Sequence, residues 1–426
     1  MFKFLKKSDF ISKVVLLISG TLIAQSITYL LSPIITRLYT PEDMSYLTFL
    51  IRISSFFAVI STARYELAFP LPKRDEHAFS LYKSTLTLTF IVVLISIFLI
   101  FFIDFYRILE VYLKPILYFI PLSIFLVAFN SQGINWAIRS KDIRSINSSK
   151  ILQSGINSLL CVVFGWFTFG VFGLIVAYLF SLLIGNYPFY NTFFKTHKKL
   201  DFNKFKRNKY AILKSYSEFP RINLPHVLMD LSKDLFVAFC LIYMFDNEVL
   251  GLYDFSYRML RLPIGLIGVS IGQVLYKKSV DLMNENKSIY PVVSKTILML
   301  LLFSIIPFGL LFFYGTEIFS FVFGSSWKEA GYYSEIMSPW LMVNFILSPV
   351  SQIPTVLNKQ KTFFILSSIT TFIFIIILTF DFVFPFFKIN FHQILFLLSI
   401  SQTICLTLMI IWILKITSSP LVIDKA

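Results

Sequence analysis

Charged residues are scarce in this sequence. Asp, Glu, Lys and Arg make up 14% of its 426 residues, whereas a typical soluble domain carries about 25%. Hydrophobic residues make up 57%, and phenylalanine alone occurs 50 times. A chain with so few polar side chains cannot cover a soluble globule with them, so the composition excludes that class. It indicates a polytopic membrane protein.

Cysteine and histidine are also few. The three cysteines lie in apolar runs without CxxC spacing, and the four histidines are scattered along the chain. The cysteines are therefore interpreted as small hydrophobic residues, and neither a disulfide framework nor a metal site is expected.

Sequence motifs of several enzyme classes are missing. GxxxxGK[ST], HExxH and GxSxG do not occur, and the dipeptide GK is absent altogether. The missing phosphate-binding loop argues against a built-in ATPase. The loops expected outside the membrane are too short for a catalytic domain. The sequence therefore predicts a protein that is not an enzyme and has no cofactor.

Long apolar runs dominate what is present. A membrane-spanning helix needs about 20 apolar residues, and about twelve segments meet that length. An all-α integral membrane protein is therefore expected. The predicted spans are residues 13–35, 44–62, 81–103, 114–137, 150–169, 171–192, 219–245, 249–275, 290–314, 334–357, 362–385 and 391–414.

Lysine and arginine alternate between the connections. With the N-terminus inside, the inside segments carry 28 of them and the outside segments 5. This bias predicts a multi-pass protein with both termini cytoplasmic. Because the basic residues are spread over short loops, the net charge of +15 gives no reason to expect nucleic acid as a partner. The most basic connection, 195–214, is predicted to link two six-helix bundles, 1–194 and 215–426.

An internal repeat carries an arginine into a predicted span of each bundle. Shifting the sequence by 206 residues aligns YTPEDMSYLTFLIRIS, 39–54, with FDNEVLGLYDFSYRML, 245–260. Arg52 then matches Arg258, and Arg261 lies one helical turn further on. A charge at the centre of a span costs about 2.5–3.5 kcal/mol on insertion scales. We therefore expect these arginines to line a hydrated substrate path, although snorkelling near an interface is an alternative.

Further charges gather in the predicted seventh span, which Pro220 and Pro225 interrupt. They are Glu218, Arg221, Asp230, Lys233 and Asp234. A broken helix at membrane depth is typical of transport sites. Arg221 and Lys233 are candidate substrate ligands, and the three acids are candidates for charge balance or ion coupling. Structural ion pairs are the alternative interpretation. Arg64 and Glu66 are a candidate gate pair or a surface ion pair.

Three stretches resemble a known family. They are ITRLYTPEDMSYLTF followed by STARYELAFPLP, then NWAIRSKDIRSINSSKILQSGINSLL at 135–160, and GSSWKEAGYYSEIMSPWLMVNFILSPVSQIPTVLNKQK at 324–361. In this order they resemble the O-antigen flippases (Wzx-type) and related polysaccharide exporters. The resemblance implies the fold of the multidrug/oligosaccharidyl-lipid/polysaccharide exporters, with two six-helix bundles in a V around a central cavity.

The resemblance also implies a function. Such a protein moves an undecaprenyl-diphosphate-linked oligosaccharide, an O-antigen or capsule repeat unit, from the cytoplasmic to the outer leaflet of the bacterial inner membrane. Alternating access, coupling to H⁺ or Na⁺ and a separate polysaccharide polymerase as partner are expected with it. By position, Arg52 and Arg258 would bind the acidic headgroup. The alternatives are a cation-coupled multidrug exporter of the same fold and, less favoured, a membrane polysaccharide polymerase.

Overall fold

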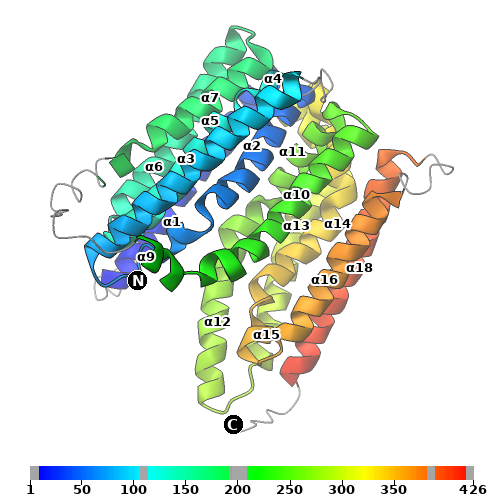
Figure 1. Ribbon diagram of the computed structural model, residues 1–426. Helices are drawn as coiled ribbons and strands as arrows, with labels where there is room; N and C mark the ends of the chain where they lie inside the picture. The colour runs from blue at the N-terminus through cyan, green and yellow to red at the C-terminus, as the bar shows by residue number, and fades with distance from the viewer. Residues whose placement is uncertain (1–8, 106–113, 191–192, 194–208, 381–388, 419–426) are drawn as a thin grey trace. The chain divides into compact units, whose positions relative to one another are not determined.

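The computed structural model describes residues 9–105, 114–190, 193, 209–380 and 389–418, and within these ranges it contains helices and no strand (Figure 1). The chain forms two compact units that meet within one helix, Met1–Phe239 and Cys240–Ala426. Residues 209–239 therefore belong to the first unit, although they follow the basic connection. Most of the predicted linker 195–214 lies outside the described residues, so its assignment stays a prediction.

The first unit follows a regular order of helices. Its elements are α1 (Asp9–Leu38), α2 (Pro41–Thr62), η2 (Tyr65–Ala68), α3 (Asp75–Phe105), α4 (Lys114–Leu117), α5 (Ile120–Arg139), α6 (Ile143–Trp166), α7 (Gly170–Gly185), α9 (Lys209–Ser215), η5 (Phe219–Asn223) and most of α10 (Leu224–Met244). Helix α6 packs between α1 and α7, and α2 packs on both α3 and α5.

The second unit continues from α10. Its elements are the end of α10, α11 (Asn247–Pro263), η6 (Ile264–Gly268), α12 (Val269–Asn284), α13 (Tyr290–Phe323), η7 (Ser325–Trp327), α14 (Lys328–Val350), α15 (Ile353–Val356), α16 (Gln360–Leu378) and α18 (Phe391–Ser418). Helix α14 is central, because α11, α12, α13 and α18 all pack against it.

A close approach of two glycines joins α13 to α14. A Cβ atom on Gly331 would lie 2.5 Å from the carbonyl oxygen of Gly315, so only a residue without a side chain fits there. Helix α13 kinks at the adjacent Tyr314 (φ −134°, ψ 19°). The backbone N–H of Thr316 instead donates to Oε1 of Glu335 on α14, at 2.7 Å. This carboxylate thus satisfies a donor that the kink frees.

Within the described residues the predicted spans fall on helices, which confirms the all-α fold. Among the described residues, seven helices are long and apolar enough to cross a membrane: 41–62, 75–102, 170–190, 290–323, 325–356, 360–378 and 391–418. Several predicted spans are divided in the structure, among them 219–245, which runs through η5 and α10, and 334–357, which runs through α14 and α15. Residues 114–137 form α4 and α5, and residues 249–275 run through α11, η6 and the start of α12.

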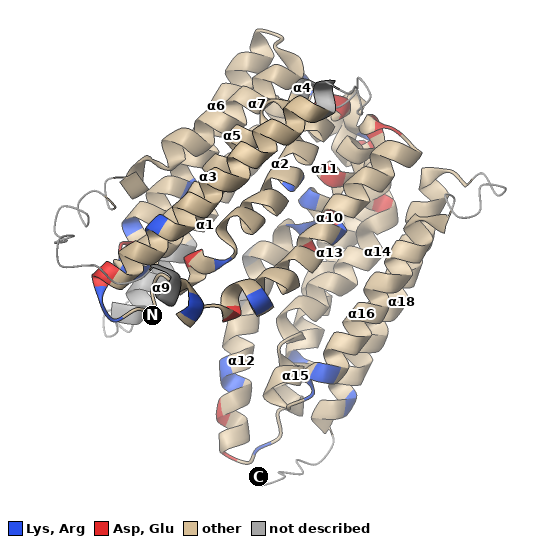
Figure 2. Cartoon of the chain, in the orientation of Figure 1, with Lys and Arg blue, Asp and Glu red and all other residues tan. Residues whose placement is uncertain are grey.

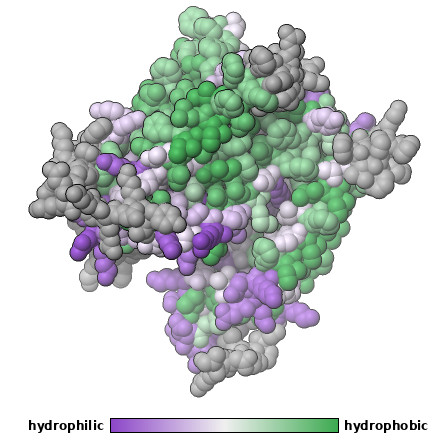
Figure 3. Space-filling view, in the orientation of Figure 1, coloured by the Kyte–Doolittle hydropathy of each residue, from purple (hydrophilic) through white to green (hydrophobic). Residues whose placement is uncertain are grey.

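Charge and hydropathy differ sharply among the helices. Figure 2 shows α3, α16 and α18 almost free of charged residues over their middle parts, whereas α10 and α11 carry charges along their length. Exposed large hydrophobic side chains are dense on α3 and α13, for example Phe98, Phe101, Ile306 and Phe313. The space-filling view shows the hydrophobic surface over α3 (Figure 3). These faces suit contact with the hydrocarbon core of a bilayer.

Candidate functional site

Helix boundaries agree with the 206-residue repeat. Helix α1 ends at Leu38 and α10 at Met244, and α2 begins at Pro41 and α11 at Asn247. Both pairs are 206 residues apart. The repeat was inferred from three identities in sixteen residues, and the structure extends it to two helix ends. Helices α2 and α11 are therefore equivalent elements of the two units.

The two helices begin with equivalent N-caps. Thr40 accepts at Oγ1 from the backbone N–H of Asp43 (3.1 Å), and Asp43 accepts from the backbone N–H of Thr40 (3.0 Å). This is a complete capping box. At the equivalent position Asp246 accepts at Oδ1 from the N–H of Val249 (2.7 Å). An acidic first turn thus starts each helix, with Glu42 in α2 and Glu248 in α11.

The caps fix where the two arginines lie. Arg52 and Arg258 are each 11 residues beyond the first residue of their helix, 41 to 52 and 247 to 258. Three residues before each arginine lies a phenylalanine, Phe49 or Phe255, and both phenylalanines are buried. The arginine therefore lies nearly one turn beyond a buried phenylalanine in both units.

Arg52 contacts α10 within the first unit. Its Nη1 donates to the backbone carbonyl of Asp234 at 2.7 Å, and its side chain is half-buried. Close by, the rings of Phe49 and Phe239 meet edge to face with centroids 5.0 Å apart. The sequence contained no signal for this contact, because the acceptor is a main-chain oxygen 182 residues away. Asp234 was singled out for its carboxylate, whereas Arg52 binds its backbone.

Arg258 and Arg261 are exposed on α11 and stack on aromatic rings. The guanidinium carbon of Arg258 lies 5.6 Å from the ring centroid of Phe255. That of Arg261 lies 5.1 Å from the ring of Tyr257, and Nη1 donates to the Tyr257 hydroxyl at 3.2 Å. Such cation–π contacts orient a guanidinium while its edge stays accessible. The sequence placed Arg261 one helical turn beyond Arg258, and both side chains are exposed.

The predicted break in the seventh span lies at Pro220. Residues Phe219–Asn223 form a π-helical turn, η5, and α10 starts at Leu224. Of the charged residues there, Lys233 is half-buried, and the others, Glu218, Arg221, Asp230 and Asp234, are exposed. The four exposed groups are accessible to solvent, and the roles of all five as ligands or coupling groups stay predictions.

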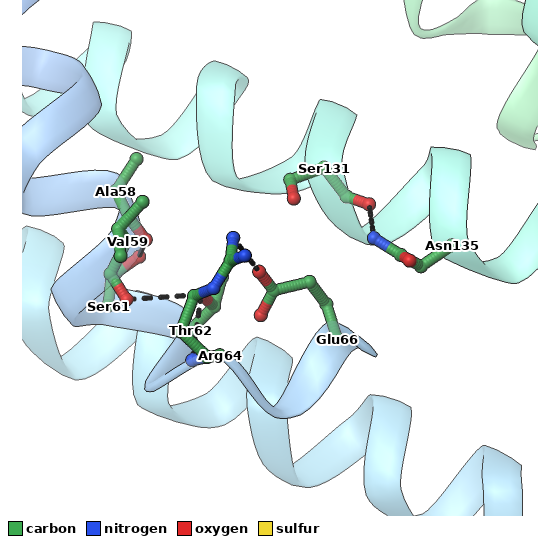
Figure 4. A network of polar contacts seen from close by, with 8 residues as sticks. All are labelled: Ala58, Val59, Ser61, Thr62, Arg64, Glu66, Ser131 and Asn135. Carbon is green, nitrogen blue, oxygen red and sulfur yellow. Dashed lines mark hydrogen bonds and ion pairs between the residues drawn. The ribbon is translucent and has the colours of Figure 1, made fainter. Parts of the chain in front are cut away.

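Arg64 and Glu66 form an ion pair in the turn after α2. Nη1 of Arg64 lies 3.3 Å from Oε1 of Glu66, and the two side chains are 20% and 1% exposed. Figure 4 shows them pointing toward each other, with Ser131 of α5 opposite. Burial raises the pKa of Glu66, while the hydroxyls of Thr62 and Ser131 and the charge of Arg64 lower it in part. The sequence offered a gate pair or a surface ion pair. The structure shows an ion pair whose carboxylate is buried.

Arg139 at the end of α5 was counted in the sequence only as a topology signal. Its Nη1 donates to the backbone carbonyls of Phe69 and Pro72, each at 2.8 Å, and its Nη2 lies 2.6 Å from Oδ1 of Asp75. These bonds hold the connection from η2 to α3 in place. The hydrogen bonds to main-chain oxygens could not be inferred from residue types.

The described ranges contain no cluster of three or more His, Cys, Asp or Glu residues that could hold a metal ion. The chemistry available at the α2, α10 and α11 sites is therefore that of guanidinium, ammonium and carboxylate groups. Guanidinium groups bind phosphate oxygens in a bidentate manner and stay charged at any physiological pH.

Comparisons with known proteins agree with this description. Residues 34–331 match the profile of a family described as "Polysaccharide biosynthesis protein". No curated protein matches the chain. Solved structures match it over most of its length.

One similar structure is an inward-facing multidrug resistance MATE family transporter of the MOP superfamily (TM-score 0.69, 16% identity, 94% of this chain and 100% of that chain). Another is a MATE protein in complex with MaD3S (0.58, 14%, 95% and 96%). A third is a MOP superfamily transporter from Pyrococcus furiosus, described as having a binding pocket of reverse polarity (0.56, 15%, 95% and 95%). At these identities the likeness establishes the fold.

Proposed function

Because the chain belongs to the family of polysaccharide biosynthesis proteins and has the fold of MOP superfamily transporters, we propose that it is a flippase for a lipid-linked oligosaccharide. The substrate is an oligosaccharide on a polyprenyl diphosphate, of the undecaprenyl type, that serves as an O-antigen or capsule repeat unit. The protein moves it from the cytoplasmic to the outer leaflet of the inner membrane by alternating access.

The matched arginines carry this proposal. Each unit presents one guanidinium at the same position of an equivalent helix, Arg52 on α2 and Arg258 on α11. A diphosphate has two anionic groups, and two arginines match that charge. A guanidinium has five donors in a fork, so it can bind a carbonyl or stack on a ring and still bind a phosphate. Arg261, Arg221 and Lys233 add positive charge on the same or neighbouring helices.

The proposed roles of the remaining charged groups follow from their chemistry. Glu218, Asp230 and Asp234 compete for the cations when the diphosphate leaves, which returns the empty carrier to its starting state. Their carboxylates also suit a coupling proton or sodium ion. Release requires that binding stay moderate, so a site with competing acids is suited to transport.

A multidrug exporter is the second candidate, and the MATE structures with the same fold favour it. A site for cationic drugs needs acidic and aromatic groups, whereas the repeat-matched positions here are arginines. The reverse-polarity pocket described for the P. furiosus transporter supports the view that this fold accommodates sites of different charge. The polymerase alternative has no support from a catalytic motif or from the fold.

Reconstituted flipping tests the proposal. Purified protein in liposomes is given a fluorescent polyprenyl-diphosphate sugar, and its loss from the inner leaflet is followed. Arg52→Ala and Arg258→Ala are compared with Arg144→Ala, which removes an exposed arginine from the first turn of α6. Flipping by wild type and Arg144→Ala, but not by the other two, supports the proposal. Transport of a cationic dye without flipping supports the multidrug alternative.

A further inference from the structure

Glu66 is a buried carboxylate that is not among the residues proposed to bind the diphosphate. It is 1% exposed and lies in η2, between the membrane-spanning helices α2 and α3. Exposed acids titrate without consequence, whereas a buried carboxylate changes its surroundings when it gains or loses a proton. Glu66 is therefore a group whose protonation has structural effects.

The surroundings of Glu66 are polar but carry little charge. Oε1 pairs with Arg64, and the hydroxyls of Thr62 on α2 and Ser131 on α5 lie near the carboxylate. The elements that pack on η2 are α3, α5 and η5, and α9 contacts it through Tyr65. Their titratable groups nearest this end are Asp75, Glu76, His77, Tyr82 and Lys83 on α3, Arg139 on α5, Lys214 on α9 and Arg221 on η5. Arg64 forms the ion pair with Glu66.

The backbone at this pair is held in an uncommon conformation. Ala63 (φ 47°) and Arg64 (φ 60°) are both left-handed, although neither is glycine. This conformation is disfavoured for residues with a side chain and persists where the surroundings hold it. The bond from the N–H of Arg64 to Oγ1 of Thr62 is long, at 3.4 Å. The Arg64–Glu66 ion pair is thus one of several contacts at this turn, beside the backbone bonds from the N–H of Ala63 to the carbonyl of Ile60 (3.0 Å) and from the N–H of Leu67 to the carbonyl of Arg64 (3.3 Å).

The turn is joined to the segment that leads into α10. The hydroxyl of Tyr65, next to Glu66, donates to the carbonyl of Leu213 on α9 at 3.3 Å. Arg221 on η5 lies close enough to lower the pKa of Tyr65 in part, against burial, which raises it. Tyr65 also belongs to a buried cluster with Phe69, Tyr82, Trp136 and Ile212. The turn is therefore in contact with α9 and with η5, which directly precedes α10.

We propose that Glu66 is the proton-binding site through which this flippase takes up its coupling proton. One proton from water adds to the carboxylate, the ion pair with Arg64 breaks, and the turn at Ala63 and Arg64 is released. Loss of the proton restores the pair. The second unit has no equivalent, since the 206-residue offset places Ser270 and Gly272 at these positions. The coupling role rests on the proposed function, whereas proton binding does not.

Infrared spectroscopy tests proton binding without any substrate. The carbonyl band of a protonated carboxyl group is followed in liposomes as the pH is raised. The control is Glu285→Gln, because Glu285 pairs with Lys287 at the same two-residue spacing but is 56% exposed. Wild type and Glu285→Gln should show a band that titrates above the range of exposed carboxyls, and Glu66→Gln should lose it.

Arg64→Gln separates a proton site from a merely structural residue. Removing the positive charge favours the neutral carboxyl, so the band should titrate at higher pH than in wild type. An unchanged midpoint, or a band that survives in Glu66→Gln, would overturn the proposal.

Coupling is then measured as the effect of a pH gradient on flipping of the fluorescent polyprenyl-diphosphate sugar. The gradient should accelerate wild type and Glu285→Gln but leave the rate of Glu66→Gln unchanged. A gradient effect that survives in Glu66→Gln would contradict the coupling role. If wild type does not flip the sugar, the proposed function fails, while the infrared titration still decides whether Glu66 binds the proton.

Discussion

Helices α2 and α11 occupy the same place in the repeat, but their arginines make different contacts. Arg52 is half-buried and bonds to a main-chain oxygen of α10, whereas Arg258 is exposed and stacks on Phe255. Both units thus place the arginine at the same position of its helix, but different groups surround it.

The helices also diverge at their ends. The offset aligns Thr62, the last residue of α2, with Gly268, the last residue of η6. After Thr62 the chain turns through Ala63 and Arg64 into η2, whereas after Gly268 it continues directly as α12. The first unit therefore has an ion pair with a buried carboxylate where the second unit continues as helix. Glu66 is the proton site that we propose for the first unit.

The largest effect on stability is expected for Arg52. Arg52→Ala removes a charged hydrogen bond that joins α2 to α10, which should lower the free energy of unfolding by about 1.5 kcal/mol, the low end for such bonds because the group is half-exposed. Thermal unfolding of the purified protein in detergent measures it. Arg144→Ala is the exposed-arginine control and should change stability little. Equal losses in both variants would mean that the Asp234 contact contributes nothing.

Removing either N-cap should have a smaller and matched effect. Thr40→Ala and Asp246→Ala each delete the side chain that accepts from the first turn, at a cost of about 1 kcal/mol. Thr40→Ser keeps the acceptor and should stay near wild type. If only one of the two alanine variants loses stability in the same unfolding assay, the helix starts are equivalent in sequence but not in energy.

Arg258 should contribute least to stability. Its stacking on Phe255 is solvent-exposed, so Arg258→Ala should lower the unfolding free energy by about 0.5 kcal/mol. A loss as large as that of Arg52→Ala would show that the exposed arginine has a structural role, and the contrast between the two helices would fail.

The pH dependence of stability sharpens the difference at the helix ends. Burial raises the pKa of Glu66 above 4.5, the usual value for glutamate, so in the window above that value the folded protein binds more protons than the unfolded one. Stability should fall as pH rises through this window. In Glu66→Gln this component should vanish, and in Glu285→Gln it should persist. Unfolding measured across the window in all three proteins checks the sign.

Hydropathy was enough to predict the helical class, because membrane insertion requires long apolar runs. The repeat was predicted from residues that match at an offset of 206, such as Arg52 and Arg258. Hydropathy did not predict the division of 249–275 by a π-helical turn, since the apolar pattern continues through it. The left-handed turn at Ala63 and Arg64 was also missed, because neither residue type favours it.

Contacts to main-chain oxygens were beyond prediction for a different reason. Arg52 bonds to the carbonyl of Asp234, and Arg139 to those of Phe69 and Pro72. Every residue has a carbonyl group, so the partner depends only on how the helices pack. The burial of Glu66 likewise follows from α5 and the aromatic cluster around η2, and the sequence indicated only its two-residue spacing from Arg64.

Flipping of a fluorescent polyprenyl-diphosphate sugar by Arg52→Ala, Arg258→Ala and the double variant, at equal amounts of folded protein, tests the central claim most directly. If both arginines bind the diphosphate, each single variant should lose at least about tenfold in rate, the equivalent of about 1.4 kcal/mol, despite their unequal effects on stability. Wild-type rates in the folded single variants would contradict the account and leave the matched arginines without a role in transport.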